Sequence, residues 1–250
     1  MNKQIEICCG SYYDALQSYK GGAKRIELNS ALHLGGLTPS LASLIMTKQN
    51  TNLKVISMVR PRGGGFAYNK EDVELIFQDA KILMENGSDG LAFGFLKEDS
   101  TLDRALTKDM VDLIHKYNGE AVFHRAFDCV TTPDETMEAL IEIGVDRILT
   151  SGLQAKAWDG RDMLAHLQEK YGDKIEILAG SGVNDTNATQ LMKETGIYQV
   201  HSSCKDWLND PTTSTKNVTY GYADTPNENN YDVVSSIKVA KLVGSIFNER

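Results

Sequence analysis

The chain has 250 residues, 41% of them hydrophobic and 24% charged, which is the composition of a globular protein with a large core. That length fits one α/β barrel, although it would also accommodate two smaller domains. A formal net charge of −8 excludes a general attraction to nucleic acid or anionic lipid, while local basic residues could still bind an anion in a cleft.

Short apolar, β-branched runs alternate along the chain with longer segments of helical periodicity. The predicted strands are Gln4–Cys8, Arg25–Asn29, Lys54–Arg60, Gly90–Gly94, Ala121–His124, Arg147–Thr150, Glu176–Gly180 and Gln199–Ser202. The predicted helices are Tyr12–Lys20, Ser40–Lys48, Lys70–Glu85, Thr107–Tyr117, Asp134–Ile143, Gly160–Tyr171, Asn187–Glu194 and a closing amphipathic stretch, Tyr231–Phe247. Eight strands each followed by a helix predict parallel pairing, because parallel neighbours need a crossover connection. The predicted fold class is therefore α/β, with residues 1–250 forming a single (β/α)8 TIM barrel.

A weak internal repeat supports the barrel. At Gly22, Gly87, Gly144 and Gly196 a glycine ends a predicted helix, and a strand follows within a few residues. Glycine is expected there because the residue that stops a helix often takes a left-handed conformation. The four glycines recur at intervals of roughly two βα units, and an open doubly wound sheet gives no reason for such even spacing.

One polar segment, Lys205–Asn230, interrupts the pattern between the eighth strand and the last helix. It is rich in Asn, Thr, Asp and Pro and contains Trp207, Tyr220 and Tyr222. A loop of this length in a compact domain usually serves as a lid or an interface, or is disordered. Because it follows the eighth strand, we expect it over or beside the C-terminal face of the barrel, or in the interface of a homo-oligomer.

Three absences indicate the cellular compartment. The first predicted strand begins almost at Met1, which leaves no room for a secretory signal, and no apolar run reaches the roughly 18 residues of a membrane span. The four cysteines do not form a disulfide framework and are expected to be reduced thiols. We therefore expect a cytoplasmic protein with neither a membrane nor a nucleic-acid partner.

Polar residues gather where the predicted strands end, which is the face of a barrel where active sites are built. They are Glu6, Cys8, Cys9, Glu27, Asn29, Arg60, Arg62, His124, Arg125, Asp128, Thr150, Ser151, Ser181, His201, Ser202 and Cys204. Side chains alternate along a strand, so Glu6 and Cys8 are expected to enter the barrel together. The side chains expected to converge on one pocket are Glu6, Glu27, Arg60, Arg62, His124, Asp128 and His201.

Arg60 and Arg62 precede a glycine-rich turn, and arginines at a strand end suit bidentate capture of a carboxylate or phosphate on a small anionic ligand. They could equally neutralise Glu6 and Glu27 as a structural ion network. The candidate ligand-binding set is completed by Arg125, Ser151, Ser181 and His201.

His124 and Asp128 are four residues apart and could form an oriented acid/base pair, with Glu6 and Glu27 as further candidate catalytic carboxylates. The alternative is a core histidine that is satisfied by a neighbouring carboxylate.

The glycine-rich segment around Ser181 follows the seventh strand, where many barrels hold phosphate on backbone N–H groups. Without a ligand the same segment is only a tight turn.

The four cysteines all fall at or just past strand ends. Strands one and eight are neighbours in a closed barrel, so Cys8, Cys204 and His201 could converge. Two thiolates and an imidazole would suit Cu(I), a soft ion. Buried, inert thiols are the alternative, because no metal-binding spacing enforces the site.

Several motifs together resemble one family. They are Glu6-Ile7-Cys8 and the segments 21–28, 35–40, 60–64, 123–128 and 147–152. From Ile5 to about Ser203 the chain is similar to the CutC family of copper homeostasis proteins. The resemblance implies a TIM barrel, a cytoplasmic location and a role in copper handling or Cu(I) binding, and it implies no settled enzymatic reaction.

The sequence departs from the family pattern at three positions. Many members have cysteine where this chain has Asn29 and aspartate where it has Gly65, and some have cysteine where it has Ser202. The missing thiols weaken a cysteine-based copper site, while the retained charged residues favour a site built on charge. Two functions therefore stand: a copper-binding protein of copper homeostasis, or a barrel enzyme acting on a small anionic or phosphorylated metabolite.

Overall fold

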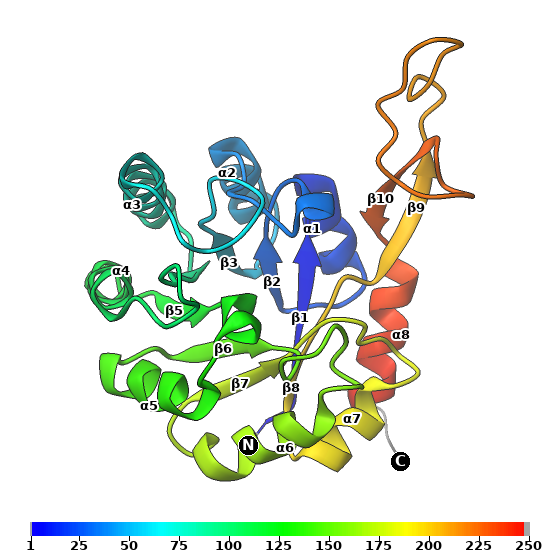
Figure 1. The fold of residues 1–250 in the computed structure, drawn as a ribbon. Coiled ribbons are helices and arrows are strands. Elements are labelled where there is room, and N and C mark those ends of the chain that lie inside the picture. The colour runs from blue at the N-terminus through cyan, green and yellow to red at the C-terminus, as the bar shows by residue number, and fades with distance from the viewer. Residues whose placement is uncertain (1, 248–250) are drawn as a thin grey trace.

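The structure, a computed structural model, describes residues 2–247. Its eight parallel strands close into a barrel in sequence order, which confirms the predicted TIM barrel (Figure 1). The strands are β1 (Gln4–Cys9), β2 (Arg25–Leu28), β3 (Lys54–Met58), β4 (Gly90–Phe93), β5 (Glu120–Phe123), β6 (Arg147–Thr150), β7 (Glu176–Ala179) and β8 (Gln199–Ser202).

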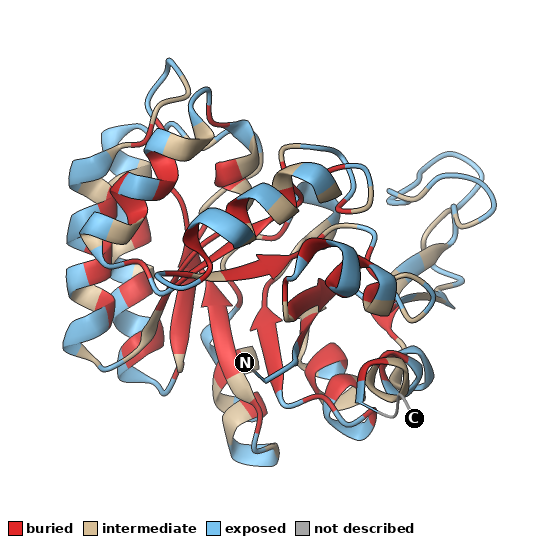
Figure 2. Cartoon of the chain, turned by 90° about the horizontal axis from the view of Figure 1, so that it is seen from below, coloured by how far each residue is buried: buried red, intermediate tan, exposed pale blue. Residues whose placement is uncertain are grey.

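Helices surround the barrel, and Figure 2 shows buried residues on the strands and on the helix faces turned toward them. The helices are α1 (Tyr12–Lys20), α2 (Leu41–Asn50), α3 (Lys70–Glu85), α4 (Arg104–Lys116), α5 (Pro133–Ile143), α6 (Arg161–Tyr171), α7 (Ala188–Thr195) and α8 (Ser236–Phe247). Local sequence sets their ends: Ser11 caps α1 by accepting from the N–H of Asp14, and Gly144 ends α5 with a φ of 93°.

The predicted glycine stops are confirmed, because Gly22, Gly87, Gly144 and Gly196 all have positive φ. The positions of the predicted elements also agree with the structure to within a few residues, with one exception. The stretch from Tyr231 was predicted to be helical throughout, whereas the structure has strand β10 (Asn230–Val234) before α8 begins. Tyr231, Val233 and Val234 favour a strand, and pairing with an adjacent segment outweighs the helical periodicity.

Opposite faces of the strands bury different residues. On the outer face, Ile7 and Ile26 are fully buried against the helices. The inner face holds an apolar cluster of Ile56, Met58, Ala92 and Val122. Beside that cluster the barrel interior is charged.

The interior charges are centred on Glu6 and Arg147, which are each 1% exposed. Nε of Arg25, directly across from Glu6 on β2, lies 2.8 Å from the Glu6 carboxylate. Arg147 lies 2.8 Å from both Glu120 and Glu176. Burying a charge costs free energy unless the charge is paired. The barrel can therefore bury these side chains only as ion pairs. The sequence had offered Arg60 and Arg62 for this neutralising role, and the structure gives it to Arg25 and Arg147.

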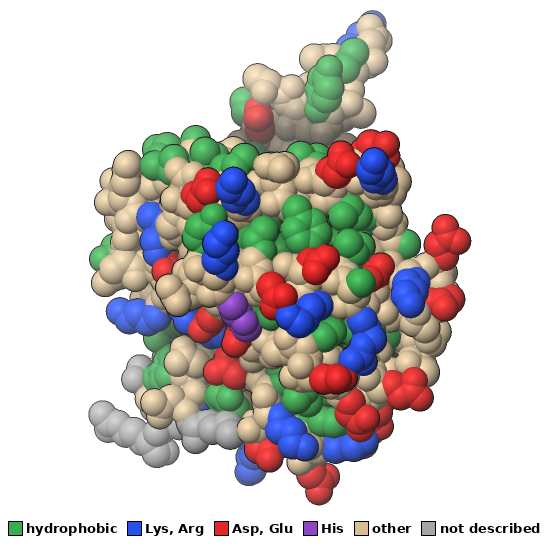
Figure 3. Space-filling model, turned by 90° about the vertical axis from the view of Figure 1, so that its left-hand side faces the viewer, with side chains coloured by type: hydrophobic (Ala, Val, Ile, Leu, Met, Phe, Trp, Pro, Cys, Tyr) green, Lys and Arg blue, Asp and Glu red, His purple; other side chains and the backbone are tan. Residues whose placement is uncertain are grey.

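The segment 205–234 forms an arm beside the barrel. Strand β9 (Lys205–Asn209) pairs antiparallel with β10, and the chain between them projects away from the barrel (Figure 1). Figure 3 shows hydrophobic side chains on this projection, where Val218 is 54% and Tyr220 83% exposed. The segment expected as a loop thus begins as a strand, at the C-terminal face.

Within residues 2–247, none of the helices combines the length and the apolar character that a membrane crossing requires.

Candidate functional site

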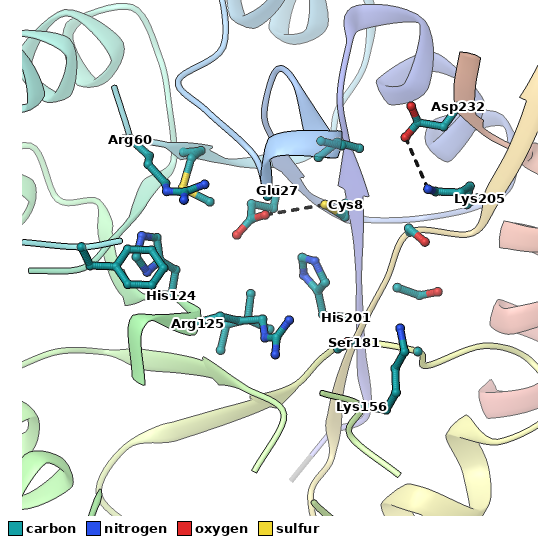
Figure 4. A pocket seen from close by; sticks show the side chains of 18 residues that line it. Cys8, Glu27, Arg60, His124, Arg125, Lys156, Ser181, His201, Lys205 and Asp232 are labelled. Carbon is teal, nitrogen blue, oxygen red and sulfur yellow. Dashed lines mark hydrogen bonds and ion pairs between the residues drawn. The ribbon is translucent and has the colours of Figure 1, made fainter. Parts of the chain in front are cut away.

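The C-terminal ends of the strands surround a cavity of about 370 Å³ (Figure 4). Of the residues predicted to converge there, Glu27, Arg60, His124 and His201 line the cavity. Arg125 and Ser181 line it as well, whereas the lining does not include Glu6, Arg62, Asp128, Ser151 or Cys204.

Cys8, Glu27 and His201 form the centre of the cavity, and we call them the triad. They come from the neighbouring strands β1, β2 and β8, and each offers one ligand atom within 4.8 Å of the others. The thiol of Cys8 lies 3.8 Å from Oε2 of Glu27 (Figure 4). Cys8 is half-buried and lines the cavity.

His201 is held from below by Glu6, whose Oε1 lies 2.9 Å from Nδ1 of the imidazole. Burial lowers the pKa of His201, but the bond to Glu6 and the charge of Glu27 outweigh burial and raise it above its usual value. Burial also opposes the charge on Glu6, yet Arg25 and His201 outweigh it and lower the Glu6 pKa to about 2. Glu6 is therefore an ionised carboxylate that supports His201 from beneath the cavity. It was expected to be catalytic, but it does not line the cavity.

Burial raises the pKa of Cys8 well above the usual thiol value, and the charge of Glu27 adds to the shift. Burial likewise raises the pKa of Glu27, with Glu6 adding to the shift and His201 opposing it. Asn29 donates through Nδ2 to Oε2 of Glu27 at 2.9 Å, which fixes the carboxylate. Cys8 is thus a neutral thiol beside the carboxylate of Glu27, which Asn29 holds in place.

Arg60 does not form the expected clamp. Its guanidinium donates to the backbone carbonyls of Leu34, Gly36 and Gly64, so most of its donors are already used. Arg62 turns away to the outer rim, where its Nε lies 2.7 Å from the carboxylate of Asp72. Arg60 contributes positive charge to the cavity and shapes its wall.

His124 and Asp128 do not form the expected acid/base pair. Nδ1 of His124 accepts the N–H of Ala126 at 3.1 Å, which leaves the hydrogen of a neutral ring on Nε2. Burial, together with the charge of Arg60, lowers the pKa of His124 to about 3, so the ring is neutral at physiological pH. Nε2 is buried and has no hydrogen-bond partner among residues 2–247.

Asp128 instead holds the loop after β6. Its carboxylate accepts from Thr150, from the N–H and hydroxyl of Ser151, and from the N–H of Leu153. Nε of Arg125 lies 2.7 Å from the same carboxylate. These interactions occupy both oxygens of the carboxylate and give Asp128 and Ser151 a structural role.

The other cysteines lie outside the triad. Cys9 points to the helix side, where its sulfur lies 3.2 Å from the hydroxyl of Ser18. Cys204 is buried, with its thiol 3.6 Å from the hydroxyl of Ser202. The residue that lies within 4.8 Å of Cys8 and His201 is Glu27, and Cys204 is not part of this group.

Some residues of the site were missed in the sequence. Lys156, Ser203, Lys205 and Asp232 line the cavity from loops and from the arm, where no periodic pattern marks them. Arg25 and Arg147 could have been found in the sequence, because each is the first residue of a strand and follows a glycine of the repeat by three residues.

Comparisons with known proteins agree with the resemblance in sequence. The model of the CutC family matches residues 3–206. A CutC protein of Treponema denticola is 40% identical over 246 residues, which cover 98% of this chain and 99% of that protein. The copper homeostasis protein cutC homolog of Homo sapiens is 35% identical over 201 residues, which cover 80% of this chain and 73% of that protein.

Solved structures give the same picture. The crystal structure of CutC from Streptococcus agalactiae has a TM-score of 0.76 and 28% identity, and the match covers 80% of this chain and 98% of that one. A phosphoribosylanthranilate isomerase from Thermotoga maritima shares the fold alone, with a TM-score of 0.56 and 12% identity. Because the family model spans most of the chain and the relatives match through all eight barrel strands, this protein belongs to the CutC family.

Proposed function

We propose that this protein takes part in copper homeostasis by binding a copper ion at the triad of Cys8, Glu27 and His201. The observation that carries the proposal is the convergence of a thiol, a carboxylate and an imidazole within 4.8 Å at an accessible cavity. The copper ion is the cargo in this function.

The surroundings of His201 support a metal ligand. Histidines that bind metals usually place one ring nitrogen against a carboxylate, which fixes the ring and leaves the other nitrogen for the ion. Glu6 takes Nδ1 of His201 in this way, and Arg25 holds Glu6 in turn. Nε2 of His201 is then the nitrogen available to an ion in the cavity.

The donor set fits copper, with one thiol as the decisive ligand. Thiolate sulfur selects Cu(I) and imidazole also suits copper, whereas carboxylate oxygen is a harder donor. Cys8 and His201 would therefore bind Cu(I), and Glu27 would add negative charge beside the ion. The raised pKa of the Cys8 thiol means that binding must displace its proton.

Relatives add a second line of support, because the human relative is named a copper homeostasis protein. A cytoplasmic location is part of the same proposal, since Cu(I) and free thiols both require a reducing compartment.

Competition with a chromophoric Cu(I) chelator under anaerobic conditions tests the proposal. Cys8→Ser should weaken Cu(I) binding by at least about tenfold, and Cys129→Ser should leave it unchanged because Cys129 is exposed outside the cavity. Equal affinity for the parent and Cys8→Ser would contradict a site at the triad.

A second candidate function is catalysis on a small anionic metabolite. The cavity volume of about 370 Å³ favours it, because that is the size of a small-molecule site and a metal ion needs far less. Glu27 and His201 would then serve as the carboxylate and imidazole for proton transfer, with neutral His124 on another wall of the cavity.

Incubation of metal-free protein with small phosphorylated and carboxylated metabolites tests this candidate. Conversion that Glu27→Gln abolishes supports an enzyme. Conversion that persists in Glu27→Gln, or no conversion of any compound, counts against it.

A further inference from the structure

Among the described residues that line the cavity, Lys156 is the cation without a partner. Arg60 is held by backbone carbonyls, Arg125 by a carboxylate, and Lys205 lies 3.9 Å from a carboxylate. For Nζ of Lys156, residues 2–247 provide no hydrogen bond or ion pair. Figure 4 shows this side chain beside Ser181, reaching into the cavity.

Two hydrogen bonds fix the backbone on either side of Lys156. The hydroxyl of Ser181 donates to the carbonyl of Ala155 at 2.7 Å, and the N–H of Ala157 donates to the carbonyl of Ser181 at 3.0 Å. The stem of the lysine crosses Gly182 so closely that a Cβ there would lie 2.9 Å from Cδ of Lys156. The loops after β6 and β7 thus hold the backbone and the stem of Lys156 at the rim of the cavity, where the residue is exposed.

Backbone donors surround that place. Ser181 and Gly182 both line the cavity with positive φ, at 78° and 75°. Within the described part of the chain, neither of their N–H groups has an acceptor, and the hydroxyl of Ser203, which also lines the cavity, has no partner either. An ammonium group beside unpaired backbone N–H groups is the arrangement that binds oxyanions.

We propose that Lys156, the N–H groups of Ser181 and Gly182, and the hydroxyl of Ser203 form a subsite for the phosphate of a small phosphate monoester. Among the described residues, the cavity lining carries four Lys and Arg side chains, namely Arg60, Arg125, Lys156 and Lys205, against the two carboxylates Glu27 and Asp232. That balance favours a dianion over a monoanion.

His124 lines the same cavity beyond the subsite. Its Nε2–H has no acceptor among residues 2–247, and the side chain is 3% exposed and lines the same cavity. A phosphate at the β7–β8 rim leaves the remainder of the ligand over the triad, in the cavity that His124 also lines. The subsite goes beyond copper binding and does not depend on it.

Titration of metal-free protein with sn-glycerol 3-phosphate, followed by NMR, tests the subsite. The parent protein should bind, and Lys156→Met should weaken binding about tenfold because a charge-assisted hydrogen bond is lost. Lys24→Met is the matched control, because Lys24 is exposed at the opposite end of the barrel, just before β2, and should bind like the parent. Equal binding by the parent and Lys156→Met overturns the proposal, as does the absence of binding by the parent.

Two further measurements separate a phosphate site from a carboxylate site, and this subsite from the copper site. Lactate identifies a carboxylate site if it binds where the phosphate ester does not, and that result overturns the assignment to phosphate. Lys156→Met should bind Cu(I) as tightly as the parent, because Lys156 is not a member of the triad. A failure of the copper site and a failure of this subsite are therefore distinguishable.

Discussion

Nδ1 of His201 lies 2.9 Å from Oε1 of Glu6 inside the barrel, where the two side chains are 9% and 1% exposed. The contact joins the floor of the cavity to the ion pairs of the barrel interior, since Glu6 also pairs with Arg25. It sets the orientation of the imidazole at the triad. Folding of the barrel core and geometry of the site therefore depend on the same carboxylate.

Glu6→Gln should destabilise the protein by about 3–5 kcal/mol, because it leaves the buried charge of Arg25 without its partner. Urea unfolding measures the change. Glu74→Gln is the control, since Glu74 forms an exposed ion pair with Lys70 and should change stability by less than about 1 kcal/mol. Similar losses in both variants would show that the interior ion pairs have no special weight.

Asp128→Ala should cost about 3 kcal/mol, because the carboxylate accepts several hydrogen bonds from the loop after β6. The same loop carries Lys156, so the variant should also bind glycerol phosphate more weakly. Calorimetry and the NMR titration measure the two effects. A variant with unchanged stability and a specific loss of turnover on a metabolite would restore the catalytic role first expected of Asp128.

His124 should make the folded state sensitive to acid. Its pKa in the folded protein is about 3, below the ordinary 6.5, so protons bind the unfolded chain more strongly between those values. Stability from this group is complete above pH 6.5 and falls as the pH drops, by at most about 1.4 kcal/mol per pH unit. Between pH 7 and pH 5 the parent should lose about 2 kcal/mol more than His124→Asn, measured by urea unfolding. Parallel curves for the two proteins would exclude a neutral, buried His124.

The tip of the arm should be dispensable for the barrel. Replacing residues 210–229 with Asn-Gly joins β9 to β10 by a turn that suits an antiparallel hairpin, because Asn209 and Asn230 are paired. The replacement removes the stacking of Tyr222 on His33 and the hydrogen bond from Tyr222 to Asp232. The melting temperature should fall by only a few degrees, and Cu(I) binding should persist. A shortened chain that cannot fold would show that the tip has a structural role.

Much of the fold could be predicted from the sequence, because its signals are local. The alternation of apolar runs with helical segments indicates the barrel, and Gly22 and Gly144 mark helix ends through the left-handed conformation they adopt. The exception is Tyr231, where local periodicity favoured a helix and pairing with Leu208 on β9 decided for a strand.

The site could be predicted only in part. Strand-end position indicates that Cys8, Glu27 and His201 lie near one another, because a closed barrel brings neighbouring strand ends together. It does not show which polar side chains already have their hydrogen bonds satisfied by neighbouring residues. Arg60 donates to backbone carbonyls, and Asp128 accepts from the loop after β6. The position of Lys156 could not be predicted from the sequence, because it depends on hydrogen bonds between two loops.

X-ray absorption at the copper edge of Cu(I)-loaded protein tests the central proposal most directly, because it counts the ligands of the ion. Binding at the triad predicts one sulfur, from Cys8, together with the nitrogen of one imidazole, from His201. The sulfur signal should vanish in Cys8→Ser and persist in Cys204→Ser. Two sulfur ligands, or none, would contradict a copper site made by Cys8 and His201.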